Sequence, residues 1–259
     1  MKTLRLVVKY CKHNLTARNT GGFGVHSPFI FNFIQGVLKE KHPFYIFNKI
    51  EQIREKLCKD NRSIQTVDFG TGKSGVRKIA DIASKASKQP QIAQLLFRII
   101  HYYHFKDVLE LGTSLGISAM YMASATKDGH CMTLEGCPET VSIARENFKE
   151  LGVTNIELIT CNINEMLEDM LKKHGEQDFI FIDANHRYEA LIEYFSICVN
   201  YLKGNSIIVI DDIYWSKGME KAWSEIKEHP QITATIDIFH LGIIFFNPEL
   251  KKKHYKIRF

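Results

Sequence analysis

One segment, residues 106–122, limits most strongly what this chain can fold into. Its sequence, KDVLELGTSLGISAMYM, predicts an apolar strand, a turn bracketed by two glycines and then a helix. The glycines are Gly112 and Gly116, and glycine lets backbone N–H groups approach a ligand where a Cβ would block them. A strand, a glycine turn and a helix start form the cradle that binds nucleotides in α/β folds. We therefore expect a nucleotide-type ligand at this turn.

A second short strand follows at the spacing of a βαβ unit. The residues CMTLE, 131–135, end in an acid, Glu135. An acid at the end of the second strand of such a unit can accept both ribose hydroxyls of an adenosine. The distance from Gly116 to Glu135 fits one helix and its return turns. The two segments together indicate an adenosine-containing ligand.

From residue 105 onward, predicted strands alternate with predicted helices, which indicates a parallel sheet covered on both faces. The strands are expected near residues 107–111, 131–135, 156–160, 178–183 and 206–210, and the helices near 117–126, 138–150, 164–173, 187–202 and 217–228. The last two strands, 232–238 and 241–246, are too close in sequence for a helix between them. They predict an antiparallel hairpin at the edge of the sheet.

The segment VLELGTSLG and the acid Glu135 resemble the first two motifs of the class I S-adenosylmethionine-dependent methyltransferases. The resemblance covers residues 105–259 and implies a Rossmann-like α/β fold with a seven-stranded, mostly parallel sheet whose last strand is antiparallel. Residues 1–104 are then a mainly helical N-terminal extension, a candidate lid or dimerisation region. The resemblance implies S-adenosylmethionine as the cofactor. The implied contacts come from Glu110, Gly112, Thr113, Ser114, Gly116, Ser118, Glu135, Asn162 and Asp183.

Two alternatives to a methyltransferase share the same sheet. A nicotinamide-dependent oxidoreductase also has an acid after its second strand, but its glycine loop carries a third glycine where this chain has Ala119. A non-catalytic protein could keep the cofactor fold without turnover. Both alternatives remain open at the level of sequence.

Carboxylates follow two neighbouring strands of the predicted sheet. Asp183 ends DFIFID, and Asp211 and Asp212 end IIVIDD. The carboxyl ends of parallel strands meet at one edge, where α/β folds bind ligands. Hard oxygen ligands of this kind suit Mg²⁺ or Ca²⁺ better than zinc. Alternatively, Asp183 caps the following helix and the other two are solvated turn residues.

The segments IDANHRYEA and VIDDIYW resemble the cation-dependent O-methyltransferases of the catechol and caffeoyl-coenzyme A type, and the related group that methylates sugars of antibiotics. This resemblance implies that Asp183, Asp211 and Asp212 are ligands of Mg²⁺ or Ca²⁺, and that the methyl acceptor is a small-molecule hydroxyl. Histidine titrates in the pH range that is useful for acid–base catalysis, so His186 is the candidate base that takes the hydroxyl proton. His186 and Asp183 are the candidate catalytic residues. Alternatively, His186 is a solvent-facing residue at a helix start.

Three aromatic residues follow the paired aspartates: Tyr214, Trp215 and Trp223. They would either line an acceptor pocket or pack the last helix on the sheet.

In the N-terminal extension, the segment GGFGVHSPF at 21–29 is either a lid or a connector, and Ser27 before Pro28 predicts a helix start.

A second glycine-rich segment, residues 67–75, contains a literal GxGxxG and the letters GKS. A Walker phosphate loop needs a glycine at position 67, where this chain has valine. No strand ending in an acid follows, because residues 76–87 and 91–105 both predict helices. We interpret the segment as a turn between packed elements.

Composition excludes several other classes of protein. The chain of 259 residues has 45% apolar and 24% charged residues and a net charge of +5, much of it near the two ends. Without aromatic–basic platforms, these charges predict solvated tails rather than nucleic-acid binding. The six cysteines include no CxxC pair and predict reduced thiols. We expect neither a signal peptide nor an apolar run long enough to span a membrane, so we predict a soluble, cytoplasmic protein. A homodimer is a candidate assembly.

Overall fold

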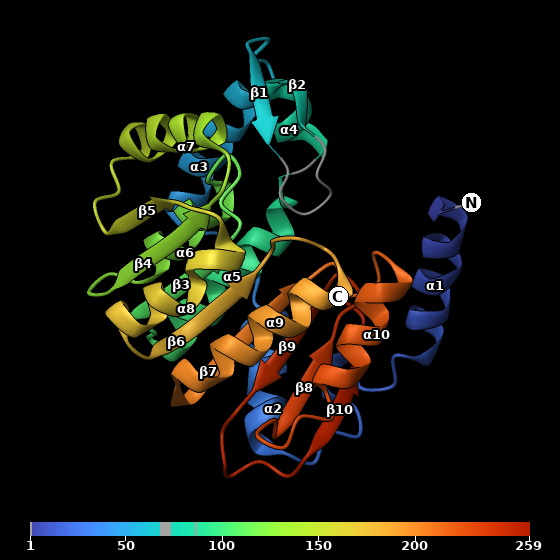
Figure 1. The fold of residues 1–259 in the computed structure, drawn as a ribbon. Coiled ribbons are helices and arrows are strands. Elements are labelled where there is room, and N and C mark those ends of the chain that lie inside the picture. The colour runs from blue at the N-terminus through green and yellow to red at the C-terminus, as the bar shows by residue number, and fades with distance from the viewer. Residues whose placement is uncertain (1, 68–73, 86) are drawn as a thin grey trace. The chain divides into compact units, whose positions relative to one another are not determined.

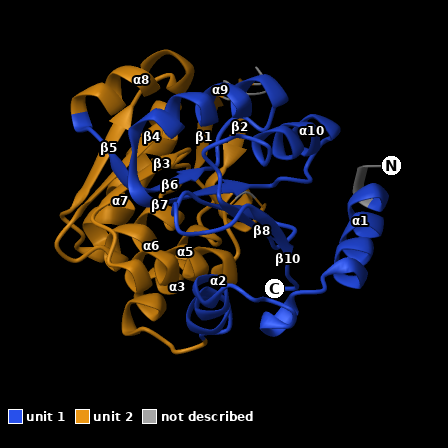
Figure 2. Ribbon diagram, turned by 90° about the horizontal axis from the view of Figure 1, so that it is seen from below, with its two compact units in different colours: residues 1–40, 174–259 blue, residues 41–173 orange. Residues whose placement is uncertain are grey.

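The computed structural model describes residues 2–67, 74–85 and 87–259 (Figure 1). The chain divides into two compact units (Figure 2). Unit 1 comprises residues 1–40 and 174–259, and unit 2 comprises residues 41–173. The predicted boundary between the N-terminal extension and the methyltransferase domain, at residue 104/105, was placed where the family resemblance begins. This boundary stays a prediction.

Unit 2 is built on three parallel strands in the order β3-β4-β5. They are β3 (Asp107–Leu111), β4 (His130–Glu135) and β5 (Ile156–Thr160). Leu111 pairs with Leu134, and Glu135 pairs with Thr160, so the three carboxyl ends reach the same edge. β3 and β4 are apolar and largely buried, as expected for parallel strands with both faces covered, whereas in the edge strand β5 the buried residue is Leu158.

The helices of unit 2 lie close to the predicted ranges. They are α3 (Tyr45–Leu57), α4 (Ile79–Lys85), α5 (Pro90–Tyr103), α6 (Ile117–Ala125), α7 (Pro138–Leu151) and α8 (Ile163–His174, whose last residue is assigned to unit 1). Pro90 and Pro138 stand at first-turn positions, where a missing backbone N–H costs nothing. Helix α6 is buried on nearly all sides, which suits the helix that continues from the glycine turn.

A small antiparallel hairpin stands beside these helices: β1 (Ser63–Val67) and β2 (Ser74–Lys78). The predicted helix over residues 76–87 is therefore wrong at its start, because residues 76–78 pair with β1 and the helix α4 begins at Ile79. Strand pairing is a non-local interaction that the local apolar pattern did not reveal. Of the glycine-rich turn interpreted at 67–75, residues 68–73 lie outside the described residues.

Unit 1 contains five strands in the order β10-β8-β9-β7-β6 among the residues described. They are β6 (Gln177–Ile182), β7 (Leu202–Asp211), β8 (Ala234–Asp237), β9 (Leu241–Phe245) and β10 (Lys253–Lys256). β6 and β7 are parallel, and β9 is antiparallel to both β7 and β8, which confirms the hairpin. The predicted edge position is wrong, because β10 pairs in parallel with β8 and adds one strand beyond the seven expected.

The helices of unit 1 come from both ends of the chain. They are α1 (Lys2–Thr16), the 3₁₀ turn η1 (Thr20–Gly22), α2 (Pro28–Phe33), the π-helical turn η2 (Ile34–Leu38), α9 (Tyr188–Cys198), the 3₁₀ turn η3 (Val199–Tyr201) and α10 (Lys217–Ile226). The Ser27 side chain accepts a hydrogen bond from the backbone N–H of Ile30, which confirms the predicted start of α2. The ring of Phe33 packs edge-on against Phe245 of β9, so α2 is anchored on the sheet of this unit.

The observed architecture is thus a mixed α/β fold with a mostly parallel sheet and helices. Residues 1–104 are mainly helical where the structure describes them, apart from the β1–β2 hairpin, and their role as a separate extension stays a prediction. Among the described residues, no helix is long and apolar enough to span a bilayer.

Candidate active site

The glycine turn of unit 2 has the backbone that its sequence predicts. Gly112 has φ of 99°, Ser114 has 49° and Gly116 has 82°, all in the left-handed region. A Cβ at Gly116 would lie 2.5 Å from Cε1 of Phe148 on α7, closer than van der Waals contact permits. Glycine at 116 is therefore required both by the backbone conformation and by the packing of α6 against α7.

Glu135, at the end of β4, is tied to this turn. Its Oε2 accepts a hydrogen bond of 2.7 Å from the backbone N–H of Ser114, and its Oε1 accepts one of 2.9 Å from Cys137. The backbone N–H of Gly112 donates to Leu134 at 2.9 Å. Each carboxylate oxygen can accept more than one hydrogen bond, so Glu135 keeps capacity for hydroxyl donors of a ligand.

Glu110, one residue before the end of β3, is fully buried. Its carboxylate accepts hydrogen bonds from the hydroxyls of Ser118 and Thr133, and Thr113 is hydrogen-bonded to Thr133 at 2.5 Å. Burial raises the pKa of Glu110 to about 7, against the lowering effect of the two hydroxyl donors. Glu110, Thr113 and Ser118, three of the predicted cofactor residues, thus form one buried network beneath the glycine turn.

Asn162 lies directly after β5 and before α8. Its Oδ1 accepts from the backbone N–H of Asn164 at 3.3 Å, and its Nδ2 donates to Glu165 at 2.7 Å. These are the contacts of a residue that starts a helix. The contact of Asn162 with a cofactor stays a prediction.

The predicted carboxylate cluster lies within unit 1. Ile182 pairs with Ile210 in the parallel register of β6 and β7, so Asp183, directly after β6, and Asp211, the last residue of β7, lie at neighbouring strand ends. The Asp211 side chain is nearly buried at 3% exposure, whereas that of Asp212 is 36% exposed. Asp212 has a left-handed φ of 50°, and its N–H donates to His240 at 2.8 Å.

His186 lies between the three aspartates. Its Nε2 is 3.6 Å from Asp183 Oδ1, 3.6 Å from Asp211 Oδ2 and 3.7 Å from Asp212 Oδ2. Burial lowers the pKa of His186, but the nearby negative charges of Asp211, Asp183 and Asp212 outweigh it, so the pKa is raised. Helix α9 begins at Tyr188 with Arg187 at the N-cap, so neither Asp183 nor His186 has the helix-start role of the alternative interpretation.

The donor set at this cluster fits a divalent cation. One ligand atom each from Asp183, His186 and Asp211 lie within 4.8 Å of one another, and the group is half-buried to buried. Three carboxylates at one sheet edge repel one another unless a positive charge lies among them. Oxygen ligands of this kind suit Mg²⁺ or Ca²⁺, and the imidazole nitrogen also suits a softer transition metal.

This chain resembles known proteins in sequence and in fold. It matches the O-methyltransferase family model over residues 73–253, about seven-tenths of its length. The chain belongs to this family. A catechol O-methyltransferase of Niastella koreensis is 31% identical over 133 residues, which are 50% of this chain and 58% of that protein. The chain spans about half to three-fifths of the length of the curated relatives it matches.

Solved structures of methyltransferases share the fold. A Podospora anserina methyltransferase bound to S-adenosylhomocysteine (SAH) has a TM-score of 0.57 at 20% identity, covering 80% of this chain and 99% of that one. An O-methyltransferase of Bacillus cereus in complex with SAH also scores 0.57, at 16% identity, covering 84% and 97%. At these identities the likeness shows the class I methyltransferase fold, which confirms the predicted fold class.

The three aromatic residues after the aspartates have different environments in this O-methyltransferase family member. Trp223 is 1% exposed, and a Cβ at Gly242 of β9 would meet its ring at 2.7 Å, so Trp223 packs α10 on the sheet. Tyr214 and Trp215 instead line a cavity of about 390 Å³, together with Asp212. Tyr214 and Trp215 thus line a cavity and Trp223 has the packing role, while the use of this cavity by an acceptor stays a prediction.

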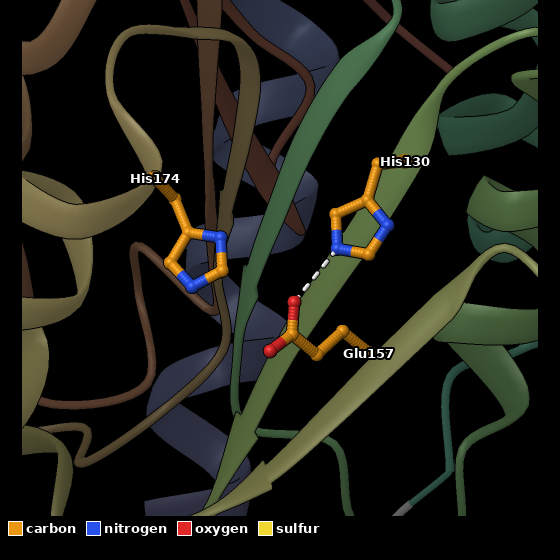
Figure 3. A group of neighbouring side chains, drawn as sticks. All are labelled: His130, Glu157 and His174. Carbon is orange, nitrogen blue, oxygen red and sulfur yellow. Dashed lines mark hydrogen bonds and ion pairs between the residues drawn. The ribbon is translucent and has the colours of Figure 1, made fainter.

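Another histidine–carboxylate pair lies in unit 2, at the amino-terminal ends of the strands. His130 begins β4, and its Nε2 lies 3.0 Å from Oε2 of Glu157 on β5 (Figure 3). The third side chain drawn there, His174, ends α8. Glu135 lies at the other end of β4, so the His130–Glu157 pair has no part in the glycine-turn site.

Some residues that shape the candidate site have little signal in the sequence. Thr133 supplies one of the two hydroxyls to Glu110, and the only sequence signal was a polar residue inside an apolar strand. Leu6, Val7 and Tyr10 of α1 line the same cavity as Tyr214. Their helical spacing was visible in the sequence, but nothing there connected them with a segment two hundred residues away.

Proposed function

We propose that this chain transfers the methyl group of S-adenosylmethionine to a hydroxyl oxygen of a small molecule. The proposed groups for the cofactor lie in unit 2, except Asp183, and the proposed groups for the acceptor hydroxyl lie in unit 1. The observation that carries the proposal is the position of His186, within 3.6–3.7 Å of three aspartates that follow two parallel strands. Membership of the O-methyltransferase family supports it.

For the cofactor, we propose that the glycine turn backs the methionine end and that Glu135 accepts the ribose hydroxyls. The left-handed backbone at Gly112 and Ser114 and the anchoring of Glu135 on the turn support this assignment. Glu110 would lie near the cofactor amino group, and its network with Thr113 and Ser118 would hold the turn beneath it. Asn162 would approach the adenine. The SAH named in the two solved structures above is the matching product.

For the acceptor, we propose that Asp183, Asp211 and Asp212 hold one Mg²⁺ or Ca²⁺ ion. A bound divalent cation lowers the pKa of a hydroxyl and fixes its oxygen, so it supplies Lewis-acid and template chemistry together. His186 accepts the proton that the hydroxyl releases as its oxygen attacks the methyl carbon. The surrounding carboxylates stabilise the resulting imidazolium.

A decisive experiment combines binding with turnover. Calorimetry with SAH and with NAD separates a methyltransferase from a nicotinamide-dependent enzyme, and we expect SAH alone to bind. Incubation with methyl-labelled S-adenosylmethionine, Mg²⁺ and a panel of phenols and sugars should then label at least one acceptor. Binding of NAD alone would refute the cofactor. SAH binding with no transfer to any acceptor would favour the non-catalytic alternative.

A further inference from the structure

Asp212 is the most exposed of the three proposed metal ligands. Its side chain is 36% exposed, against 14% for Asp183 and 3% for Asp211. Strand β7 ends at Asp211, so Asp212 lies in the loop that leads to α10. Its φ of 50° is left-handed, a conformation that is uncommon for a residue with a Cβ. The position of Asp212 beside the other two aspartates therefore depends on what holds this loop.

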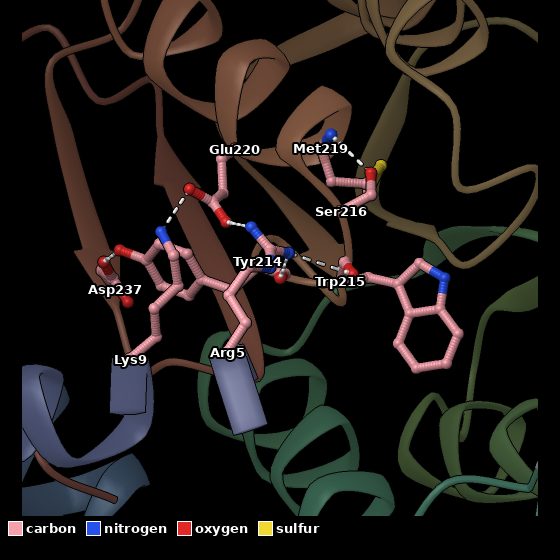
Figure 4. Close-up of polar contacts among 8 residues, drawn as sticks. All are labelled: Arg5, Lys9, Tyr214, Trp215, Ser216, Met219, Glu220 and Asp237. Atoms are coloured by element: carbon pink, nitrogen blue, oxygen red, sulfur yellow. Dashed lines mark hydrogen bonds and ion pairs between the residues drawn. The ribbon is translucent and has the colours of Figure 1, made fainter. Parts of the chain in front are cut away.

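Backbone hydrogen bonds and a helix cap fix the two ends of the loop. The backbone N–H of Trp215 donates to the Asp212 carbonyl at 2.8 Å, and the N–H of Asp212 donates to the His240 carbonyl at 2.8 Å. At the other end, Oγ of Ser216 accepts a hydrogen bond of 3.0 Å from the N–H of Met219 and caps α10 (Figure 4). The carbonyl groups between these ends accept hydrogen bonds from α1.

Arg5, on α1, joins this loop to α10 with one guanidinium group. Its Nη2 donates to the Tyr214 carbonyl at 3.1 Å and to the Trp215 carbonyl at 3.3 Å, and its Nη1 lies 2.5 Å from Oε1 of Glu220 (Figure 4). Lys9, one turn further along α1, pairs with the other oxygen of Glu220. The prediction of solvated basic tails is thus wrong for Arg5 and Lys9, because each has a carboxylate partner.

A second anchor holds α1 beside the same loop. His13 lies on the same face of the helix as Arg5 and is buried. Its Nε2 lies 3.1 Å from the Ile257 carbonyl and its Nδ1 lies 3.4 Å from Oδ1 of Asp237. The Tyr214 hydroxyl donates to the other oxygen of Asp237 at 2.5 Å. Helix α1 is therefore tied to the loop both through backbone carbonyls and through the Tyr214 side chain.

We infer that Arg5 is a positioning residue for the proposed metal centre, because its clamp on the loop holds the Asp212 carboxylate beside the other two aspartates. This inference rests on the proposed function, and on the proposed cation in particular. Before a cation binds, the aspartates repel one another, and Asp212 is the one that the loop leaves able to move away. A loop that is fixed in advance does not have to be ordered when the cation binds, so the affinity is higher.

The test measures cation binding without turnover, by electron paramagnetic resonance of Mn²⁺ titrated into the full chain with SAH present. Mn²⁺ takes the carboxylate ligands that also suit Mg²⁺. We expect saturable Mn²⁺ binding to the native chain that excess Mg²⁺ displaces. Arg5→Gln should weaken this binding about tenfold, as the loss of a group that orients a metal ligand does, with SAH affinity unchanged. Lys12→Gln, at an exposed position of α1, removes the same charge and is the matched control.

The direction of the effect separates the clamp from simple electrostatics. Removing a positive charge by itself favours a nearby cation, so weaker Mn²⁺ binding in Arg5→Gln reports the lost clamp. Arg5→Lys keeps the charge but not the planar fork of donors, and its affinity should fall between those of Arg5→Gln and the native chain.

A double variant separates positioning of Asp212 from a general loss of structure. If Arg5 acts through Asp212, then Arg5→Gln should weaken Mn²⁺ binding no further once Asp212→Ala has removed that ligand. The full additional loss in the double variant would overturn the inference, as would equal Mn²⁺ binding by Arg5→Gln and Lys12→Gln. Failure of the proposed cation site differs, because the native chain itself would then bind no Mn²⁺ that Mg²⁺ displaces, and the inference would fall with it.

Discussion

The Oε2 atom of Glu135 accepts a hydrogen bond of 2.7 Å from the backbone N–H of Ser114. This bond joins the acid at the end of β4 to the glycine turn that follows β3. Both residues belong to unit 2, so the proposed cofactor groups can be altered without changing the aspartate cluster of unit 1.

Replacing Glu135 tests the cofactor assignment. Glu135→Ala removes the proposed ribose acceptor and the anchor of the Ser114 N–H, and hydrogen bonds to charged groups contribute about 1.5–3 kcal/mol each. We expect SAH affinity to fall about 10- to 100-fold by calorimetry. Glu150→Ala, on an exposed face of α7, is the control and should bind SAH normally. An unchanged affinity in Glu135→Ala would contradict the assignment.

Removing a proposed metal ligand should separate turnover from cofactor binding. Asp211→Ala and Asp212→Ala should each lose most methyl transfer while SAH affinity stays within about twofold, because neither residue is among the proposed cofactor contacts. EDTA should have the same effect on the native chain, and added Mg²⁺ should reverse it. Activity that is indifferent both to EDTA and to Asp212→Ala would leave His186 as the base without a metal.

The buried carboxyl of Glu110 should make stability depend on pH. Its folded-state pKa of about 7 lies above the ordinary value of 4.5, so the unfolded chain gives up the proton first. Glu110 contributes on the order of 3 kcal/mol to the free energy of unfolding below about pH 4.5, and this contribution is lost as the pH rises through about 7. In Glu110→Gln this dependence disappears, because the amide does not titrate and the hydroxyls of Ser118 and Thr133 can reorient toward it.

Urea unfolding of both chains at pH 5 and pH 8, without cofactor, measures the effect. The variant should gain stability relative to the native chain as the pH rises. The same difference between the two chains at both pH values would show that the carboxyl does not titrate in this range.

Two glycines with similar backbones should differ sharply in their tolerance of alanine. Gly152 has φ of 77° with nothing within 4 Å of the point where an alanine methyl group would lie, so Gly152→Ala should cost only the left-handed strain, about 1–2 kcal/mol. Gly116→Ala has the same strain and also a clash with Phe148 at 2.5 Å, and overpacking adds about 1–3 kcal/mol. Denaturant midpoints of the two variants provide the comparison. Equal losses would mean that α7 yields to the added methyl group.

The order of strands and helices could be predicted from the sequence because its signals are local. Apolar runs, first-turn prolines and glycine turns place β3 at Asp107–Leu111 and α7 at Pro138–Leu151, within a residue of expectation. The meeting of Asp183 with Asp211 could also be predicted, since parallel strands bring their carboxyl ends to one edge.

Other features depend on contacts between segments far apart in the chain. The sequence alone indicated the residues that we propose to carry the chemistry: the glycine turn, Glu135 and the three aspartates. Only the tertiary structure decided that Glu110 is buried, that β10 extends the sheet, and that α1 is held by Glu220 beside Tyr214. The physical reason is range: helix and turn preferences act over a few residues, whereas burial, strand pairing and ion pairs join residues that no local pattern connects.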